Sequence, residues 1–197
     1  MKNSKAQIAE TWDKIASKHG SYRRKTWPQV SDFLAKASAP ILDIGCGNAS
    51  YHVSGRAAGT RKVGVIGIDI SFKTCKLASK NCTPICADAS SLPIKNSSFS
   101  RVISVATVHH LPSKTDRENF FADLRRVLKP SGEALVTALY QRGPRKNTYL
   151  KWGAEKRYYH LFSKRELTNL ANKYFTNVEL NIEKDAKHKN IYLYIQK

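Results

Sequence analysis

The chain has 197 residues, of which 41% are apolar, and its 34 Lys and Arg residues against 15 Asp and Glu give a net charge of +19 at pH 7. This length predicts one globular domain spanning residues 1–197, and no apolar run approaches the roughly 20 residues that a membrane-spanning helix needs. The first residues lack the apolar segment of a secretory signal, so we expect a cytoplasmic protein with no membrane partner. The positive charge favours nucleic acid as a partner, although a Lys-rich host proteome produces the same composition.

The four cysteines, at positions 46, 75, 82 and 86, form no C-x-x-C pair, and Pro84 interrupts the spacing of the last two. Zinc sites and disulfide frameworks have characteristic cysteine spacings that this chain lacks. We therefore expect free, partly buried thiols and no metal ion.

The first 38 residues are expected to form helices over the active site. Ile8, Trp12 and Ile15 recur at helical spacing, which predicts an amphipathic helix over residues 6–18. Residues 22–28 are dense in cations and aromatic rings, and Trp27-Pro28 begins a second helix with proline in its first turn. The segment between the helices is a candidate for contact with phosphates.

Residues 41–50 read I-L-D-I-G-C-G-N-A-S, which predicts a buried strand at 41–44 and then a tight glycine turn. Gly45 and Gly47 let the backbone approach a ligand closely, although Gly-x-Gly also occurs in turns that bind nothing. After a poorly patterned helix over 51–58, a second apolar strand at 63–70 ends near Asp69. A βαβ unit of this length brings that carboxylate beside the first turn, where it can accept hydrogen bonds from both hydroxyls of a ribose.

The middle of the chain continues the same alternation of strands and helices. We expect a helix at 71–80 capped by Ser71, a strand at 83–86 leading to Asp88, a loop at 90–100, a strand at 101–106, a helix at 116–128 and a strand at 133–139. This order predicts a mostly parallel, doubly wound sheet that binds ligands at the carboxyl ends of its strands. The carboxylates at three successive strand ends, Asp43, Asp69 and Asp88, converge there.

The periodic pattern is lost over residues 140–162, where basic side chains alternate with aromatic rings. Such a mixture suits a phosphate backbone and unstacked bases, so we expect a substrate-binding insertion, with an ordinary solvated insertion as the alternative. A helix capped by Ser163 follows, and the segments 177–182 and 190–195 alternate like an antiparallel strand pair.

Together, D-I-G-C-G, the acids Asp69 and Asp88, and the phrases L-P-I-K-N-S-S-F-S-R-V-I-S-V-A and R-R-V-L-K-P-S-G-E-A-L-V resemble the class I S-adenosylmethionine-dependent methyltransferases. The resemblance implies an α/β, Rossmann-like fold: a seven-stranded, mostly parallel sheet with helices on both faces and an antiparallel C-terminal strand. It also implies S-adenosylmethionine as cofactor, with Asp69 on the ribose and Asp88 on the adenine amino group. The expected cofactor-binding residues are Asp43, Gly45, Cys46, Gly47, Asp69, Ile70, Asp88, Ala89 and Ala106.

A narrower resemblance extends over nearly the whole chain. The motifs Y-R-R-K-T-W-P at 22–28, A-T-V-H-H-L at 106–111, R-Y-Y-H-L-F at 157–162 and the closing N-I-Y-L-Y-I-Q-K are similar to the tRNA methyltransferases that esterify the 5-carboxymethyl group of the wobble uridine. This resemblance implies a tRNA substrate and a heterodimer with a small zinc-binding activator subunit along the sheet edge. The sequence departs from that family at Thr26, at Ser50 and at Ala49, which stands in place of a third glycine and places a Cβ near the expected cofactor.

Methyl transfer to a carboxylate needs alignment more than a general base, because the nucleophile is already ionised at pH 7. A cation such as Arg23 or Arg157 can orient the carboxylate, and His109 follows the strand that faces the methyl donor. His110 is expected to pack or cap. Tyr158, Tyr159 and His160 are expected to hold a flipped-out base, with packing of one of the two tyrosines in the core as the alternative. The expected substrate-binding residues are Arg24, Lys25, Trp27, Arg145, Tyr158, Tyr159 and His160.

Three other functions fit parts of the sequence. An NAD-linked oxidoreductase would use the glycine turn, but the third glycine of that fingerprint is absent. A methyltransferase acting on a small molecule, such as a quinone or a free carboxylic acid, would share the same cofactor site. A tRNA-binding protein without activity is the third alternative.

Overall fold

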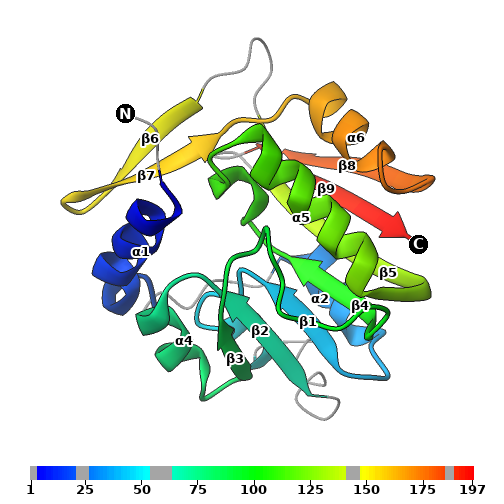
Figure 1. The fold of residues 1–197 in the computed structure, drawn as a ribbon, viewed down its shortest axis with the longest axis horizontal. Helices are drawn as coiled ribbons and strands as arrows, with labels where there is room; N and C mark the ends of the chain where they lie inside the picture. Colours follow the sequence, from blue (N-terminus) through cyan, green and yellow to red (C-terminus); the bar gives the residue numbers. More distant parts are fainter. Residues whose placement is uncertain (1–3, 21–26, 54–63, 141–146, 185–188) are drawn as a thin grey trace.

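A computed structural model of the chain describes residues 4–20, 27–53, 64–140, 147–184 and 189–197. Within these residues, seven strands form one sheet in the order β3-β2-β1-β4-β5-β9-β8, and two more form a separate hairpin (Figure 1). The strands are β1 (Ile41–Ile44), β2 (Val65–Asp69), β3 (Thr83–Cys86), β4 (Phe99–Ser104), β5 (Leu128–Leu139), β6 (Asn147–Trp152), β7 (Glu155–His160), β8 (Asn177–Lys184) and β9 (Lys189–Gln196). The helices are α1 (Lys5–Gly20), α2 (Pro28–Ala35), α4 (Phe72–Ala78), α5 (Lys114–Val127) and α6 (Lys164–Asn172), with short 3-10 helices η1 (Ser50–Val53) and η3 (Val108–His110).

The sheet confirms the predicted topology. Strands β3, β2, β1, β4 and β5 pair in parallel, and β9 lies antiparallel between β5 and β8. All four residues of β1 are buried, as expected for a central strand covered on both faces. The chain reverses its direction of travel across the sheet between β1 and β4, which is where doubly wound folds bind ligands.

Helices cover both faces of the sheet, as predicted, because successive side chains of a strand point to opposite sides. The larger core contains Leu42, Val102 and Val136 together with the apolar faces of α5 and α6. The neighbouring residues Ile41 and Ile103 belong instead to a second core, which α2 covers. The predicted caps are confirmed, since the side chain of Ser71 accepts from the N–H of Thr74 in α4 and that of Ser163 from the N–H of Glu166 in α6.

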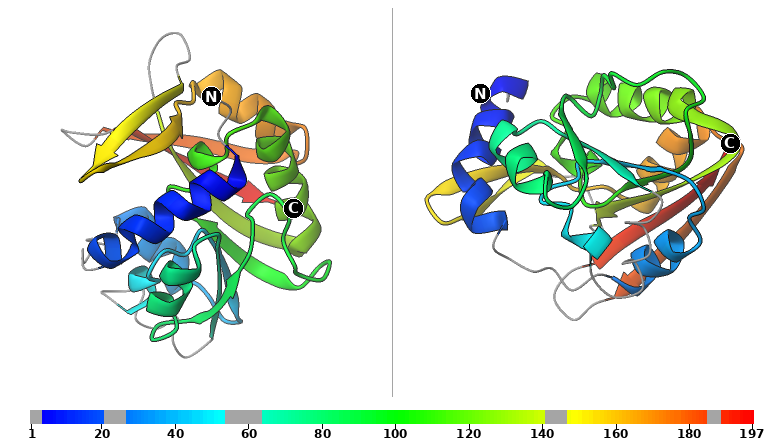
Figure 2. Two further views of the ribbon diagram at one scale, coloured as in Figure 1. Left: turned by 60° about the vertical axis from the view of Figure 1, so that its left-hand side comes forward. Right: turned by 90° about the horizontal axis from the view of Figure 1, so that it is seen from below.

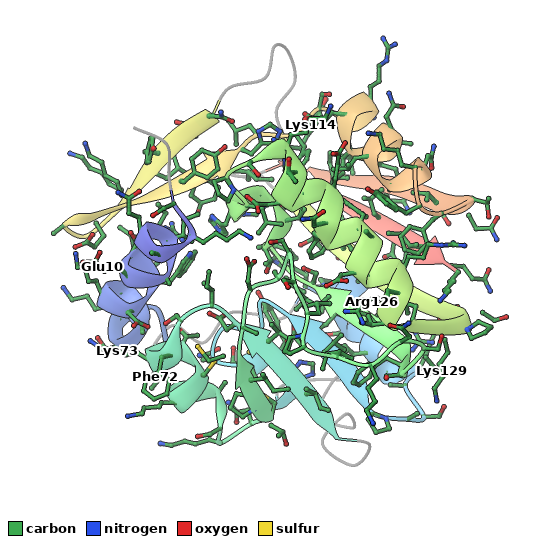
Figure 3. All side chains as sticks on the ribbon, in the orientation of Figure 1. Glu10, Phe72, Lys73, Lys114, Arg126 and Lys129 are labelled. Atoms are coloured by element: carbon green, nitrogen blue, oxygen red, sulfur yellow. The ribbon has the colours of Figure 1, made fainter. Side chains whose placement is uncertain are left out.

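The N-terminal helices occupy different places. Helix α1 lies beside α4 and β7, at the carboxyl ends of the strands (Figure 2), whereas α2 packs against the sheet. Figure 3 shows the junction of α1 and α4, where Lys73 lies at the start of α4, and the backbone N–H of Lys73 donates to Asp13 Oδ1 at 3.0 Å. Of the helix expected over 51–58, only residues 51–53 are described, and these belong to η1.

The segment 140–162 is more regular than its sequence indicates. Strands β6 and β7 pair antiparallel from Asn147↔His160 to Trp152↔Glu155, with Gly153 at φ +62° in the turn. The pattern was hard to recognise because β6 is mostly exposed while the last four residues of β7 are all buried. Strand β5 also begins earlier than expected, at Leu128. None of the described helices is long and apolar enough to cross a membrane.

Candidate cofactor and substrate site

A cavity of about 160 Å³ lies at the carboxyl ends of the parallel strands, and α1 forms its remaining wall. Eight of the nine residues expected to bind the cofactor line this cavity: Gly45, Cys46, Gly47, Asp69, Ile70, Asp88, Ala89 and Ala106. Sequence reasoning did not identify the contributions of Lys5, Ile8, Trp12 and Tyr51 to the same cavity. For Lys5 a signal was present, because it shares one helix face with Ile8 and Trp12.

The two glycines of the first turn are required for different reasons. Both have positive φ, +77° at Gly45 and +55° at Gly47. A Cβ on Gly45 would lie 1.9 Å from Thr107 Oγ1, so this glycine lets the β1 and β4 loops pack together. A Cβ on Gly47 would meet nothing within 4 Å, so this position keeps the backbone open towards the cavity.

Ala49, which stands in place of the third glycine, does not obstruct the cavity. It has φ +53°, is fully buried and packs in a cluster with Cys46 and Ala78. It is not among the residues that line the cavity. Its Cβ therefore packs away from the cavity, and its cost is the left-handed backbone conformation of an alanine.

Asp69 has the geometry expected of a ribose ligand. Its Oδ2 accepts the N–H of Gly47 at 3.0 Å and its Oδ1 accepts the N–H of Ser71 at 2.9 Å. Burial raises the pKa of Asp69 to about 6, and these two hydrogen bonds oppose the rise. The carboxylate is thus fixed by backbone, with lone pairs left for two hydroxyl donors.

Asp43 is placed differently from the other acids. It is 1% exposed, and its Oδ2 lies 2.9 Å from Nε2 of His52 in η1. Asp43 does not line the cavity. The contact with His52 anchors η1 behind the glycine turn, outside the lining of the cavity.

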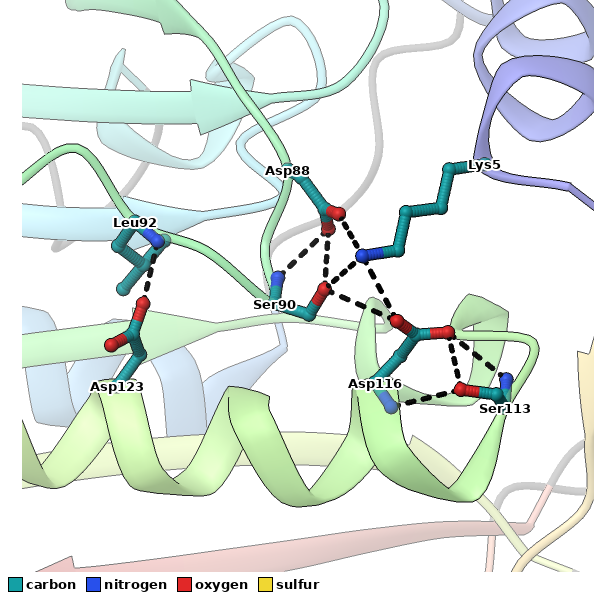
Figure 4. A network of polar contacts seen from close by, with 7 residues as sticks. All are labelled: Lys5, Asp88, Ser90, Leu92, Ser113, Asp116 and Asp123. Carbon is teal, nitrogen blue, oxygen red and sulfur yellow. Dashed lines mark hydrogen bonds and ion pairs between the residues drawn. The ribbon is translucent and has the colours of Figure 1, made fainter.

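The third acid, Asp88, belongs to an ionic network with α1 and α5 (Figure 4). Lys5 Nζ lies 2.5 Å from Asp88 Oδ2 and 2.9 Å from Asp116 Oδ1, and it donates to Ser90 Oγ at 2.8 Å. Burial works against its charge, yet the pKa of Lys5 lies above its usual value because the two carboxylates favour the protonated form. Helix α1 is therefore tied to the end of the cavity where an adenine amino group is expected.

The two histidines after β4 differ in exposure to the cavity. His110 lines it, and its Nδ1 donates to the carbonyl oxygen of Tyr158 at 2.7 Å. His109 is 3% exposed, does not line the cavity, and accepts the N–H of Leu139 at Nδ1. The structure thus places His110, not the expected His109, beside the site.

A second cavity of about 40 Å³ adjoins the first and shares Ile8, Trp12 and His110 with it. Arg157 lines this cavity and is 9% exposed. Its guanidinium lies 4.8 Å from the ring centre of Trp152 and 5.6 Å from that of Trp12, distances typical of cation–π contact. A buried cation thus lies in the cavity that adjoins the first one.

The other expected substrate residues are dispersed. Tyr158 lines the second cavity and Tyr159 the first. His160 lines neither, because its ring bridges Asn147 and Glu166 at 2.8 and 2.9 Å and so joins the hairpin to α6. Trp27 packs edge-on against Tyr192, away from both cavities. Arg23, Arg24, Lys25 and Arg145 lie outside the described residues.

The cavity fits the expected cofactor by its own features. The open space at Gly47 allows close approach of a ligand, and the two oxygens of Asp69 suit a ribose. The Tyr51 hydroxyl is buried at the cavity and has no hydrogen-bond partner within the described parts of the chain, which leaves a polar atom for a ligand. The described residues contain no cluster of three or more His, Cys, Asp or Glu that could hold a metal.

Comparison with known proteins agrees with this geometry. Residues 42–136 match the family model described as "Methyltransferase domain". The fold is similar to a Methanosarcina mazei S-adenosylmethionine-dependent methyltransferase, with a TM-score of 0.74 and 19% identity over 88% of this chain and 99% of that one. It is also similar to a Haloferax volcanii methyltransferase solved in complex with the Trm112 methyltransferase activator, with a TM-score of 0.67 and 13% identity over 95% and 96% of the two chains.

Residues 42–136 therefore carry a methyltransferase domain, and the fold is that of the class I S-adenosylmethionine-dependent methyltransferases. Among curated proteins, the chain is 35% identical over 136 residues to a tRNA (carboxymethyluridine(34)-5-O)-methyltransferase of Arabidopsis thaliana, covering 68% of this chain and 32% of that protein. It is 29% identical over 201 residues to the protein of the same name from Schizosaccharomyces pombe, covering 83% and 85%. The matched region thus spans about a third of the plant relative and most of the yeast one.

Proposed function

We propose that the chain transfers a methyl group from S-adenosylmethionine to the carboxylate of 5-carboxymethyluridine at the wobble position of tRNA. The observation that carries this proposal is the pair of adjoining cavities, one with the Asp69 turn and the other with the buried cation Arg157. The printed names of the curated relatives and the net charge of +19 support tRNA as the substrate.

The residues suit a displacement reaction without proton removal. When bound, S-adenosylmethionine supplies an electrophilic methyl group on a sulfonium. Asp69 binds the ribose hydroxyls, and Gly47 admits the ligand close to the backbone. Arg157 orients the substrate carboxylate, which is ionised at pH 7, so proximity and alignment provide the rate enhancement. Trp12 and His110 line both cavities, so the methyl donor and the substrate carboxylate meet beside these two side chains.

The proposal includes a partner subunit. The likeness to a methyltransferase solved with the Trm112 activator supports a small activator protein as partner. The edges of the seven-stranded sheet are β3 and β8, and a subunit that extends the sheet would pair with one of these. Arg23, Arg24, Lys25 and Arg145 remain proposed contacts to tRNA.

The proposal is tested by methyl transfer from tritiated S-adenosylmethionine, with the chain purified alone and together with an activator subunit. The acceptors are tRNA carrying 5-carboxymethyluridine, the same tRNA with unmodified uridine, a quinone and a free carboxylic acid. We expect label only in the carboxymethylated tRNA. Label in the quinone or the free acid, and none in tRNA, would replace the proposal with a small-molecule methyltransferase. Binding of tRNA without any transfer would indicate a binding protein.

A further inference from the structure

Two of the rings expected to hold the substrate base are already engaged in packing. Tyr159 is 7% exposed and stacks on His109, with ring centres 5.1 Å apart and planes 15° from parallel. Tyr158 is 8% exposed, and its hydroxyl donates to the carbonyl oxygen of Pro112 at 3.3 Å. Buried rings with occupied faces are poor platforms for an incoming nucleobase, which needs an accessible face.

Two other rings border the second cavity and are less buried than Tyr158 and Tyr159, although Arg157 also contacts the ring of Trp12. Tyr149 on β6 is 48% exposed, and its neighbour Tyr158 contacts it edge-on at 5.9 Å. Trp12 on α1 is half-buried and lines both cavities. The two rings come from elements far apart in the sequence, α1 and the β6-β7 hairpin, which lie side by side in Figure 2. The second cavity is therefore lined by an aromatic side chain from each of two neighbouring parts of the fold, α1 and the β6-β7 hairpin.

We propose that Tyr149 and Trp12 form a clamp that stacks the flipped-out uridine at the mouth of the second cavity. This inference rests on the proposed function and adds the site of the base to it. The cavity is too small to enclose a whole nucleobase, so the ring sits at the mouth, where Tyr149 is exposed. Lys156, exposed on the same rim, is placed for a neighbouring phosphate.

The clamp explains how the carboxymethyl arm reaches the methyl donor. Trp12 and His110 line both cavities, and their rings lie 5.0 Å apart, edge to face. A base stacked at the mouth projects its 5-substituent past this wall, beside Arg157 and towards the first cavity. Because Trp12 belongs to α1, the contacts of Lys5 with Asp88 and of Asp13 with Lys73 help to position this side of the clamp. The two cavities therefore share a wall formed by Ile8 and Trp12 of α1 and His110 of η3.

The test compares Tyr149→Ala with Tyr149→Phe and with Leu150→Ala as the matched control. Leu150 is the next residue of β6, is 39% exposed and lines neither cavity. Two quantities are measured: the Kd for an anticodon stem-loop RNA carrying 5-carboxymethyluridine, and the kcat and KM for methylation of the full tRNA. The Kd for S-adenosylmethionine is measured in parallel by calorimetry.

Loss of one stacked ring weakens RNA binding and raises KM by roughly tenfold in Tyr149→Ala, because base stacking acts equally in the ground state and the transition state. We expect kcat and the cofactor Kd to stay unchanged, Tyr149→Phe to restore most of the affinity, and Leu150→Ala to match wild type. Trp12→Phe provides a second variant that keeps a ring in the clamp, whereas Trp12→Ala weakens both RNA and cofactor binding.

The outcomes separate this inference from the proposed function. If the wild-type chain methylates the tRNA and Tyr149→Ala behaves like Leu150→Ala, the clamp is wrong and the function stands. If the wild-type chain binds the stem-loop but methylates no tRNA, the proposed function fails, and equal Kd values for Tyr149→Ala and wild type would remove the clamp as well. A loss of kcat at constant KM in Tyr149→Ala also contradicts stacking.

Discussion

Replacing Asp69 by asparagine tests the cofactor site at its best-defined residue. The carboxylate accepts two backbone N–H groups and has lone pairs for two ribose hydroxyls. In Asp69→Asn, the side-chain NH2 would point at a backbone N–H or at a ribose donor, and the charge is lost. Two charge-assisted hydrogen bonds at about 1.5 kcal/mol each correspond to a roughly hundredfold weaker Kd for S-adenosylmethionine.

The pKa of Asp69 adds a dependence on pH. With a pKa of about 6 in the free protein, the carboxylate is mostly ionised at pH 7 and mostly protonated at pH 5. Because the ribose hydroxyls require the ionised acceptor, we expect the cofactor affinity of wild type to fall about tenfold per pH unit below this pKa. Stability of the ligand-free chain changes in the opposite direction. A pKa raised from 3.8 contributes stability that is greatest below pH 3.8 and is lost as the pH rises through 6.

Both effects are measured by calorimetric titration with S-adenosylmethionine and by denaturant unfolding between pH 5 and 7. Asp69→Asn should bind weakly at every pH, and its unfolding free energy should gain relative to wild type as the pH rises. Glu10→Gln is the control, since Glu10 is an exposed residue of α1 paired with Lys14. A wild-type Kd that is unchanged from pH 7 to pH 5, or an asparagine variant that binds as tightly as wild type, would refute the role given to Asp69.

Four further substitutions test residues that line the cavity or pack behind it. Gly45→Ala should unfold at lower denaturant concentration than Gly47→Ala, since a Cβ at 45 lies 1.9 Å from Thr107 Oγ1 while one at 47 meets nothing; equal midpoints would contradict this packing. Ala49→Gly should leave the calorimetric Kd for S-adenosylmethionine unchanged, because its Cβ packs away from the cavity, and tighter binding would show the opposite. Lys5→Met should speed amide hydrogen exchange in α1 through loss of its ion pairs, whereas unchanged exchange would mean that the apolar face alone holds the helix.

The sheet and most of the cofactor cavity were predictable because their signals are local. Continuous apolar strands ending in an acid or a glycine turn identify the carboxyl edge of a parallel sheet. That pattern correctly brought Gly45, Asp69 and Asp88 to one cavity. The antiparallel C-terminal strands followed from simple alternation of apolar and polar residues.

The remaining features depend on contacts between distant segments. The pairing of Asp43 with His52 takes a strand-end acid into the core, and no periodicity reveals it. Which of His109 and His110 faces the cavity depends on their positions around the single turn of η3, and consecutive residues of such a turn point in different directions. The contact of Lys5 with Asp88 joins residues 83 positions apart, which only the fold brings together.

The proposed methyl transfer is tested most directly by mass spectrometry of the nucleosides from tRNA carrying 5-carboxymethyluridine, after incubation with the chain, an activator subunit and S-adenosylmethionine. We predict a wobble nucleoside one methyl group heavier, which returns to the free acid in mild alkali as an ester does. A methyl group that survives alkali on the base or ribose would contradict it, and so would an unchanged wobble nucleoside in a reaction that consumes the methyl donor.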